Sequence, residues 1–199
     1  MTRFNILTAV LLLASVAAVA GVAPGDQAPD FSLVDTDGHT HSLHDYLAAG
    51  QTVVLEWFNP DCPFIRKHHL DARTMNRIYT QFVADDVVWL AINSSAPGKQ
   101  GHGLDRNRLA RAEYEMPMPV LLDEDGAVGK NYGAKTTPHM FVITADGQVA
   151  YAGAIDSDRS VHQLGEINHV AEALAAITSA ESVTTAVTQP YGCSVKYGN

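Results

Sequence analysis

The chain has 199 residues, of which 46% are hydrophobic and 18% charged, and its formal net charge is −9. This length suffices for one domain with a full core, and the acidic balance would repel phosphate backbones, which argues against nucleic acid as a partner. The two cysteines, Cys62 and Cys193, are too few for a structural disulfide framework but sufficient for one redox pair.

The first 20 residues have the pattern of a secretory signal. Arg3 precedes an almost unbroken apolar run from Ile6 to Val19, and Ala18-Val19-Ala20 has the small-x-small pattern that signal peptidase reads. We expect cleavage before Gly21, a periplasmic or secreted product, and no membrane attachment afterwards. An uncleaved N-terminal anchor is the alternative.

The predicted domain covers 21–177 and is followed by a tail, 178–199, without periodicity. The elements predicted in chain order are a hairpin of 31–34 with 40–43, a helical turn over 44–49, a strand over 52–58, a helix over 63–83, a strand over 87–92, a loop over 94–103, a helix over 104–115, a strand over 120–122, a helix over 127–132, a hairpin of 140–144 with 149–153, and a helix over 161–177. On the last helix, Leu164 and Ile167 are expected to face inward. This order predicts an α/β fold with a central mixed sheet and helices on both faces.

The stretch from Val53 to His69 organises the chain. A buried strand ends at Asn59-Pro60, and Pro63 fits a helix only in its first turn, so Cys62 is expected at the helix cap. Free backbone N–H groups and the helix dipole favour negative charge there, and a thiol at that place should ionise readily. The alternative is that Cys62 is a small buried hydrophobe.

Three segments carry a resemblance to a known family. These are Ala28-Pro29-Asp30-Phe31-Ser32-Leu33, the strand and turn ending at Cys62, and Lys135-Thr136-Thr137-Pro138-His139. In this order they resemble the thioredoxin fold, in particular its redoxin branch, the alkyl hydroperoxide reductase/thiol-specific antioxidant group with an N-terminal hairpin. The tail Gly192-Cys193-Ser194-Val195-Lys196-Tyr197 resembles exported peroxiredoxin-like proteins that have one active-site cysteine and a Gly-Cys-x-x-Lys-aromatic ending.

The resemblance implies a role for several residues. Cys62 would be the nucleophile, and a cis bond before Pro138 would let the backbone of Thr137 meet a substrate strand. Asn59 and Pro63 flank the cysteine, and with Thr137 and Pro138 they are the candidate substrate-binding residues.

Glu56 and Cys193 complete the candidate catalytic set. Glu56 stands where thioredoxins keep a buried acid, which would relay a proton to a leaving thiolate, but pairing with a cation is an equal alternative. Cys193 would be the resolving cysteine on a tail that Gly192 allows to bend and Tyr191 anchors, and an unpaired tail thiol is its alternative.

Some positions depart from the family patterns. Ile65 stands where a dithiol thioredoxin has its second cysteine, so a local Cys-x-x-Cys disulfide cannot form. Asn59 and Leu55 replace the Thr or Ser and the Pro of peroxiredoxins, which argues against peroxidase activity. Arg66 replaces the second cysteine of copper-binding relatives.

The sequence therefore predicts an exported thiol–disulfide oxidoreductase or thiol-dependent antioxidant, with no metal or other cofactor. Its substrates would be thiols, disulfides or peroxides, and its electron donor is not identified. Two alternatives are a hydroperoxide reductase and a non-enzymatic copper- or zinc-binding module, in which Cys62 and His68 would be joined by Cys193 or His139. For His139 a surface position is expected.

Overall fold

A computed structural model describes residues 21–198. The predicted signal sequence lies outside the described residues. Within them, the helices are all too short or too polar to cross a membrane.

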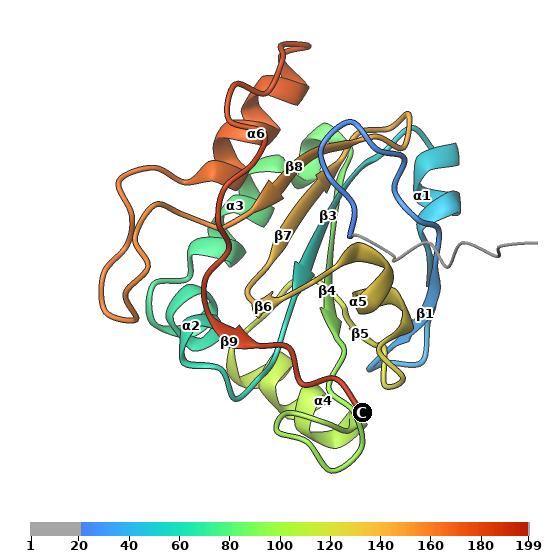
Figure 1. The fold of residues 1–199 in the computed structure, drawn as a ribbon, viewed down its shortest axis with the longest axis vertical. Helices are drawn as coiled ribbons and strands as arrows, with labels where there is room; N and C mark the ends of the chain where they lie inside the picture. The colour runs from blue at the N-terminus through green and yellow to red at the C-terminus, as the bar shows by residue number, and fades with distance from the viewer. Residues whose placement is uncertain (1–20, 199) are drawn as a thin grey trace, which may run out of the picture.

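A seven-stranded mixed sheet forms the centre of the domain (Figure 1). Its strand order is β2-β1-β5-β4-β3-β7-β8, in which β3 pairs in parallel with β4 and β4 with β5, while the other pairs are antiparallel. The strands are β1 (Ser32–Asp35), β2 (Thr40–Ser42), β3 (Thr52–Trp57), β4 (Val87–Asn93), β5 (Val120–Leu122), β7 (Met140–Ile143) and β8 (Val149–Gly153). The predicted mixed sheet and both hairpins are confirmed.

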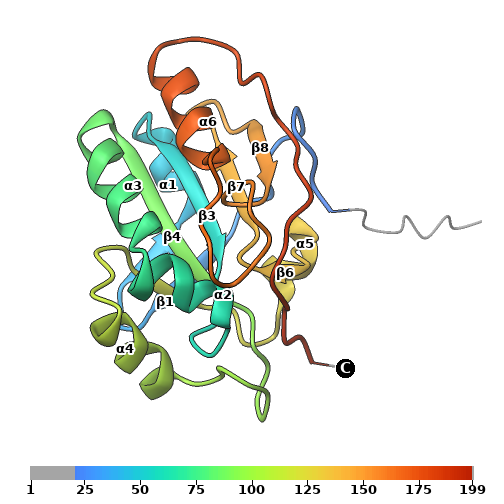
Figure 2. The ribbon, with the colours of Figure 1, turned by 90° about the vertical axis from the view of Figure 1, so that its left-hand side faces the viewer.

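Helices cover both faces of the sheet, to its left and right in Figure 1, and Figure 2 looks onto one of these faces. They are α1 (Leu43–Ala48), α2 (Pro63–Arg66), α3 (Thr74–Phe82), α4 (Leu104–Glu113), α5 (Ala127–Tyr132) and α6 (His169–Thr178), with a 3-10 turn at Val83–Asp85. Alternate residues of β3 divide the core: Val54 packs with residues of α2, α3 and α6, and Leu55 with residues of α1 and α5. All six residues of β3 are buried, which fits a strand covered on both faces.

The prediction of one helix over 63–83 is wrong. After α2 the chain forms a π-helical turn at Lys67–Asp71, and α3 begins only after Arg73, whose φ of 52° lies in the left-handed region. The wider turn buries Lys67, His68 and His69 in succession, which a regular helix at the edge of a core does not do. Each of the three side chains has its own polar partner, described below.

The last helix is shorter than predicted. It starts at His169, because the side chain of Asn168 accepts a hydrogen bond from the backbone N–H of Ala171 and caps it. Leu164 and Ile167 lie before this helix and are 43% and 44% exposed, so their predicted inward orientation is wrong.

The tail returns to the sheet end at which β3 finishes. The tail first runs along β8, where Ala152 N donates to Ala186 O at 3.0 Å. Its strand β9 (Cys193–Ser194) then pairs antiparallel with β6 (Thr136–Thr137), with Cys193 opposite Thr137. Figure 1 shows this red segment running down to β9, below the ends of β3 and β7.

Candidate active site

Cys62 occupies the cap position of α2, as predicted. Pro63 is the first helical residue, the N–H of Cys62 donates to Asn59 O at 3.1 Å, and its carbonyl accepts from Arg66 N at 3.0 Å. The side chain is only 1% exposed, so both features considered for this cysteine, a helix end and a buried place, are present together.

The structure brings Cys193 directly to Cys62. The two sulfurs, both free thiols, lie 2.9 Å apart, and Cys62 Sγ is 3.0 Å from the carbonyl oxygen of Thr137. The Thr137–Pro138 peptide bond is cis, as predicted. Burial and the neighbouring sulfur of Cys62 raise the pKa of Cys193 to about 12. Cys193 therefore keeps its proton at neutral pH. Cys62 is the candidate attacking sulfur because it lies at the start of α2.

Gly192 makes this approach possible. Its φ is +134°, and a Cβ atom there would lie 2.1 Å from Thr137 O. A residue with a side chain would collide with the strand edge that holds Cys193 and would need a strained backbone. Glycine thus lets the tail lie against β6.

Glu56 is fully buried and its carboxyl group has two partners. Trp89 Nε1 donates to Oε2 at 2.9 Å, and His69 Nε2 lies 2.7 Å from Oε1. His69 Nδ1 faces Asn76 Oδ1 at 2.8 Å and must donate, because the amide oxygen only accepts. Glu56 and His69 therefore share one further proton in their hydrogen bond, whichever group carries it. Glu56 is therefore buried, as expected, and its partners are Trp89 and His69.

His68 points instead to the tail. Its Nε2 is 3.0 Å from the hydroxyl of Tyr191, which itself donates to Asp156 Oδ1. Burial lowers the pKa of His68 to about 3, so the ring is neutral. Its single proton lies on Nε2, and among the described residues Nδ1 has no hydrogen-bond partner. Tyr191, the expected aromatic anchor of the tail, is therefore held in a buried site by hydrogen bonds to His68 and Asp156.

Lys67 and Asp156 belong to the same network and were missed by the sequence analysis. Lys67 is 3% exposed, donates to Ser160 O at 2.9 Å and Asp158 O at 3.2 Å, and lies 3.9 Å from Asp156 Oδ2. Its ammonium group is also 5.6 Å from the ring centre of Tyr191. Burial lowers its pKa. A lysine next to two histidines in a helical stretch was the available signal, but nothing indicated that all three face inward.

The remaining candidate residues differ in how they are placed. Asn59 is buried, and its side-chain amide is bonded within the protein, to Ser95 Oγ, Gln100 O and Asp61 N. His139 is only 7% exposed, so its expected surface position is wrong. It accepts from Lys135 N at 3.3 Å, and burial lowers its pKa to about 4.

The alternative metal site is not formed by the described residues. Among residues 21–198, the only three or more potential ligands whose atoms converge are Asp35, Asp37 and His39, on the β1–β2 hairpin. His68 Nε2 is already bonded to Tyr191. Cys62 and Cys193 thus meet each other without a convergent set of further ligands.

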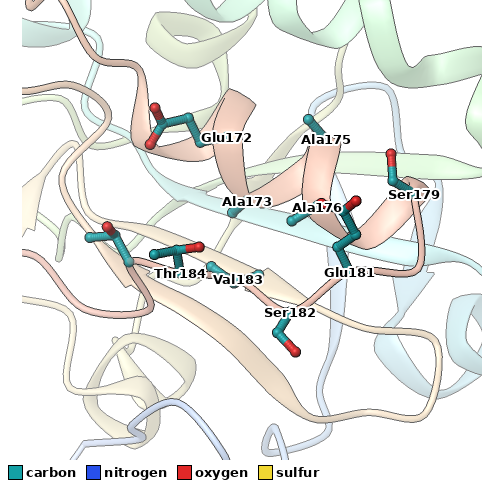
Figure 3. A pocket seen from close by; sticks show the side chains of 10 residues that line it. Glu172, Ala173, Ala175, Ala176, Ser179, Glu181, Ser182, Val183 and Thr184 are labelled. Atoms are coloured by element: carbon teal, nitrogen blue, oxygen red, sulfur yellow. The ribbon is translucent and has the colours of Figure 1, made fainter.

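Two hollows differ in their relation to Cys62. One of about 280 Å³ is lined by Pro60, Asp61, Cys62, Pro63, Arg66, Arg106, Glu113 and Tyr114. Another, of about 520 Å³, lies between α6 and residues 179–185 (Figure 3). The second is lined by small and acidic residues with no cysteine or histidine, so only the first bears on thiol chemistry.

Comparisons with known proteins agree with this geometry. The Redoxin family model matches residues 23–170. The thiol-disulfide oxidoreductase ResA of Geobacillus kaustophilus (strain HTA426) is 30% identical over 128 residues, which cover 64% of this chain and 67% of the relative.

Two solved structures show the same fold. Protein SMc02350 from Sinorhizobium meliloti 1021 superposes with a TM-score of 0.81 at 22% identity, over 90% of this chain and 97% of the other. The thioredoxin domain of thiol-disulfide oxidoreductase BVU-2223 from Bacteroides vulgatus gives 0.55 at 19% identity, over 66% and 89%. The fold is thus thioredoxin-like.

Proposed function

This chain belongs to the Redoxin family and is an oxidoreductase of the thiol–disulfide type, and we propose that it is exported, with Cys62 as its nucleophile and Cys193 as its resolving cysteine. The observation that carries the proposal is the distance of 2.9 Å between two free sulfurs that are 131 residues apart in sequence. Export rests on the signal pattern of the first 20 residues.

The proposed reaction takes two steps. The thiolate of Cys62 attacks one sulfur of a substrate disulfide, forms a mixed disulfide and releases the other sulfur as a thiolate, which takes up a proton. Cys193 then loses its proton and attacks the sulfur of Cys62, which forms the Cys62–Cys193 disulfide and releases the second substrate thiol. The substrate gains two electrons, and the protein loses them to its new disulfide. An external dithiol must restore the protein for a further cycle.

Neighbouring groups would assist these steps. We assign to the buried Glu56–His69 pair the role of holding an exchangeable proton behind the active-site turn, because the two groups share one in their hydrogen bond. Pro63 lines the hollow beside Cys62 and would meet the substrate, whereas Thr137 and Pro138 lie on the side that β9 covers. Asn59, whose amide is occupied within the protein, would position the turn.

Mass spectrometry of the protein after oxidised glutathione tests the proposal. Wild type should lose two hydrogen atoms and yield a Cys62–Cys193 cross-linked peptide. Cys193→Ser should stop at a mixed disulfide with glutathione on Cys62, and Cys62→Ser should react slowly and form no cross-link. Two free thiols in treated wild type would contradict the proposed function.

The same variants separate the alternative activity. A hydroperoxide reductase would consume one equivalent of peroxide per reduced protein and form the same disulfide before any disulfide reagent is added. We expect oxidised glutathione to react faster than peroxide, because Asn59 and Leu55 replace the peroxiredoxin residues. A faster reaction with peroxide would reverse this assignment.

A further inference from the structure

The strand edge beside Cys62 is already occupied by the protein's own tail. β9 pairs with Thr136 and Thr137 in antiparallel register, with Cys193 opposite Thr137. An extended substrate that added a strand at this edge would need the same backbone groups. While the tail is in place, this side of Cys62 is closed to an extended polypeptide.

Contacts on both sides of β9 keep the tail in place. On one side, Tyr191 is 4% exposed and bonded to Asp156 and His68. On the other side, Val195 N donates to Lys135 O at 3.1 Å, and Tyr197 donates to Ala134 O at 2.9 Å. The tail is therefore a fixed part of the site.

A second side of Cys62 faces a hollow. The hollow of about 280 Å³ is lined by Cys62 and Pro63 but by neither Thr137 nor Cys193, so it borders residue 62 on the side away from the tail. Cys62 itself is 1% exposed. The attack of Cys193 on the mixed disulfide favours a substrate on this side. In that attack, the sulfur of Cys193 and the leaving substrate sulfur must lie on opposite sides of the Cys62 sulfur. A substrate bound in the hollow leaves Cys193 free to attack from the β6 side.

We propose that the docked tail restricts Cys62 to low-molecular-weight disulfides that enter through this hollow, and that extended polypeptide disulfides are excluded by the pairing of β9 with β6. This inference rests on the proposed function and specifies its substrate class. It also assigns to Gly192 the role of a specificity-determining residue, because the tail can lie on the edge only without a side chain there.

The test uses the full chain with Cys193→Ser, so that the first attack by Cys62 is measured alone as a mixed disulfide. Two probes are compared, oxidised glutathione and an extended peptide that carries a disulfide to a small thiol. Gly192→Ala is added to push the tail off the edge. Gly198→Ala is the matched control in the same tail, because a Cβ there meets no atom closer than Ala96 Cβ at 3.4 Å.

With the tail docked, oxidised glutathione should react at least about tenfold faster than the peptide. Gly192→Ala should raise the rate with the peptide by about tenfold, which is expected if the edge is free less than a tenth of the time, and should change the rate with glutathione much less. Gly198→Ala should change neither. Faster amide hydrogen exchange at Val195 would report that the tail has left the edge.

Two results overturn the inference in different ways. Equal rates for the two probes with the tail docked, or no gain with the peptide in Gly192→Ala despite faster exchange at Val195, would overturn the substrate restriction and leave the proposed function standing. Failure of Cys62 to form a mixed disulfide with either probe would overturn the proposed function and the restriction with it.

Discussion

His68 and His69 are neighbours in the chain, are both fully buried, and belong to different networks. His69 is bonded to Glu56 on β3 and Asn76 on α3, so its partners are core elements. His68 is bonded to Tyr191, a residue of the tail. The π-helical turn at Lys67–Asp71 directs one ring to the core and the other to the tail.

The difference separates contacts that hold the core together behind Cys62 from contacts that hold the segment with Cys193. Breaking the His69 network leaves buried polar groups without partners inside the core, so the main cost should be stability. Breaking the His68 network frees the segment that carries Cys193, so the main cost should be the second step of the reaction. The following predictions test this division.

Glu56→Ala should have the largest effect on stability. It leaves Trp89 Nε1 and His69 without their partner in a site that water does not reach, which should lower the free energy of unfolding by about 3–5 kcal/mol. Urea denaturation at pH 7 measures this loss. Glu56→Gln, which retains volume and an acceptor oxygen, is the control and should lose less. A loss below about 1 kcal/mol in the alanine variant would show that the pair is dispensable.

Tyr191→Phe should affect the second step of the reaction more than the first. It removes the hydroxyl between Asp156 and His68 and retains the ring, and a buried hydrogen bond to a charged group contributes about 1.5–3 kcal/mol. The Cys62–Cys193 disulfide should form roughly tenfold more slowly, while the formation of the mixed disulfide on Cys62 is little changed. Quenched-flow alkylation followed by mass spectrometry separates the two steps. Equal slowing of both would mean that the phenol supports the whole site and not the tail alone.

His68→Gln should flatten the dependence of stability on pH. The buried ring has a pKa of about 3 in the folded protein against about 6.5 when unfolded. Between these values the unfolded state binds an extra proton, so stability falls as pH decreases below 6.5 and is unaffected above it. Between pH 7 and pH 5, wild type should lose about 2 kcal/mol more than the variant. An identical loss in both would show that His68 does not cause the acid sensitivity.

Tyr197→Phe should have the smallest effect. Its hydroxyl donates to Ala134 O, a neutral partner, at the edge of the tail. The loss should be about 1 kcal/mol or less, and the rate of disulfide formation should stay within about twofold of wild type. If disulfide formation slowed as much as in Tyr191→Phe, the two tyrosines would hold the tail equally.

Much of the fold followed from local patterns. The strand Thr52–Trp57, both hairpins and the cap at Cys62 were predicted because apolar runs, Asp-Gly turns and Pro63 are local signals. The break in the helix predicted over 63–83 was not predicted, because no glycine or proline at Arg73 indicates it. The helix predicted over 161–177 begins only at His169. The apolar Leu164 and Ile167 suggested a longer helix than the cap at Asn168 allows.

Part of the site was also predicted from the sequence. Cys62, Cys193, Thr137 and Pro138 lie together as the resemblance implied. The tail network was not predicted beyond Tyr191, because Asp156 and Lys67 are distant in sequence and follow no period. Such contacts depend on the position of a whole segment and leave no local pattern.

The separation of the two cysteines has a thermodynamic consequence. With Ile65 in place of a nearby partner, oxidation would close a loop between residues that are 131 positions apart. A cross-link over so long a loop restricts the unfolded chain and raises the free energy of unfolding by about 2–5 kcal/mol. The oxidised enzyme should therefore melt at a higher temperature and resist proteases longer than the reduced one. In each catalytic cycle the enzyme would pass through this more stable oxidised form before the dithiol donor reduces it.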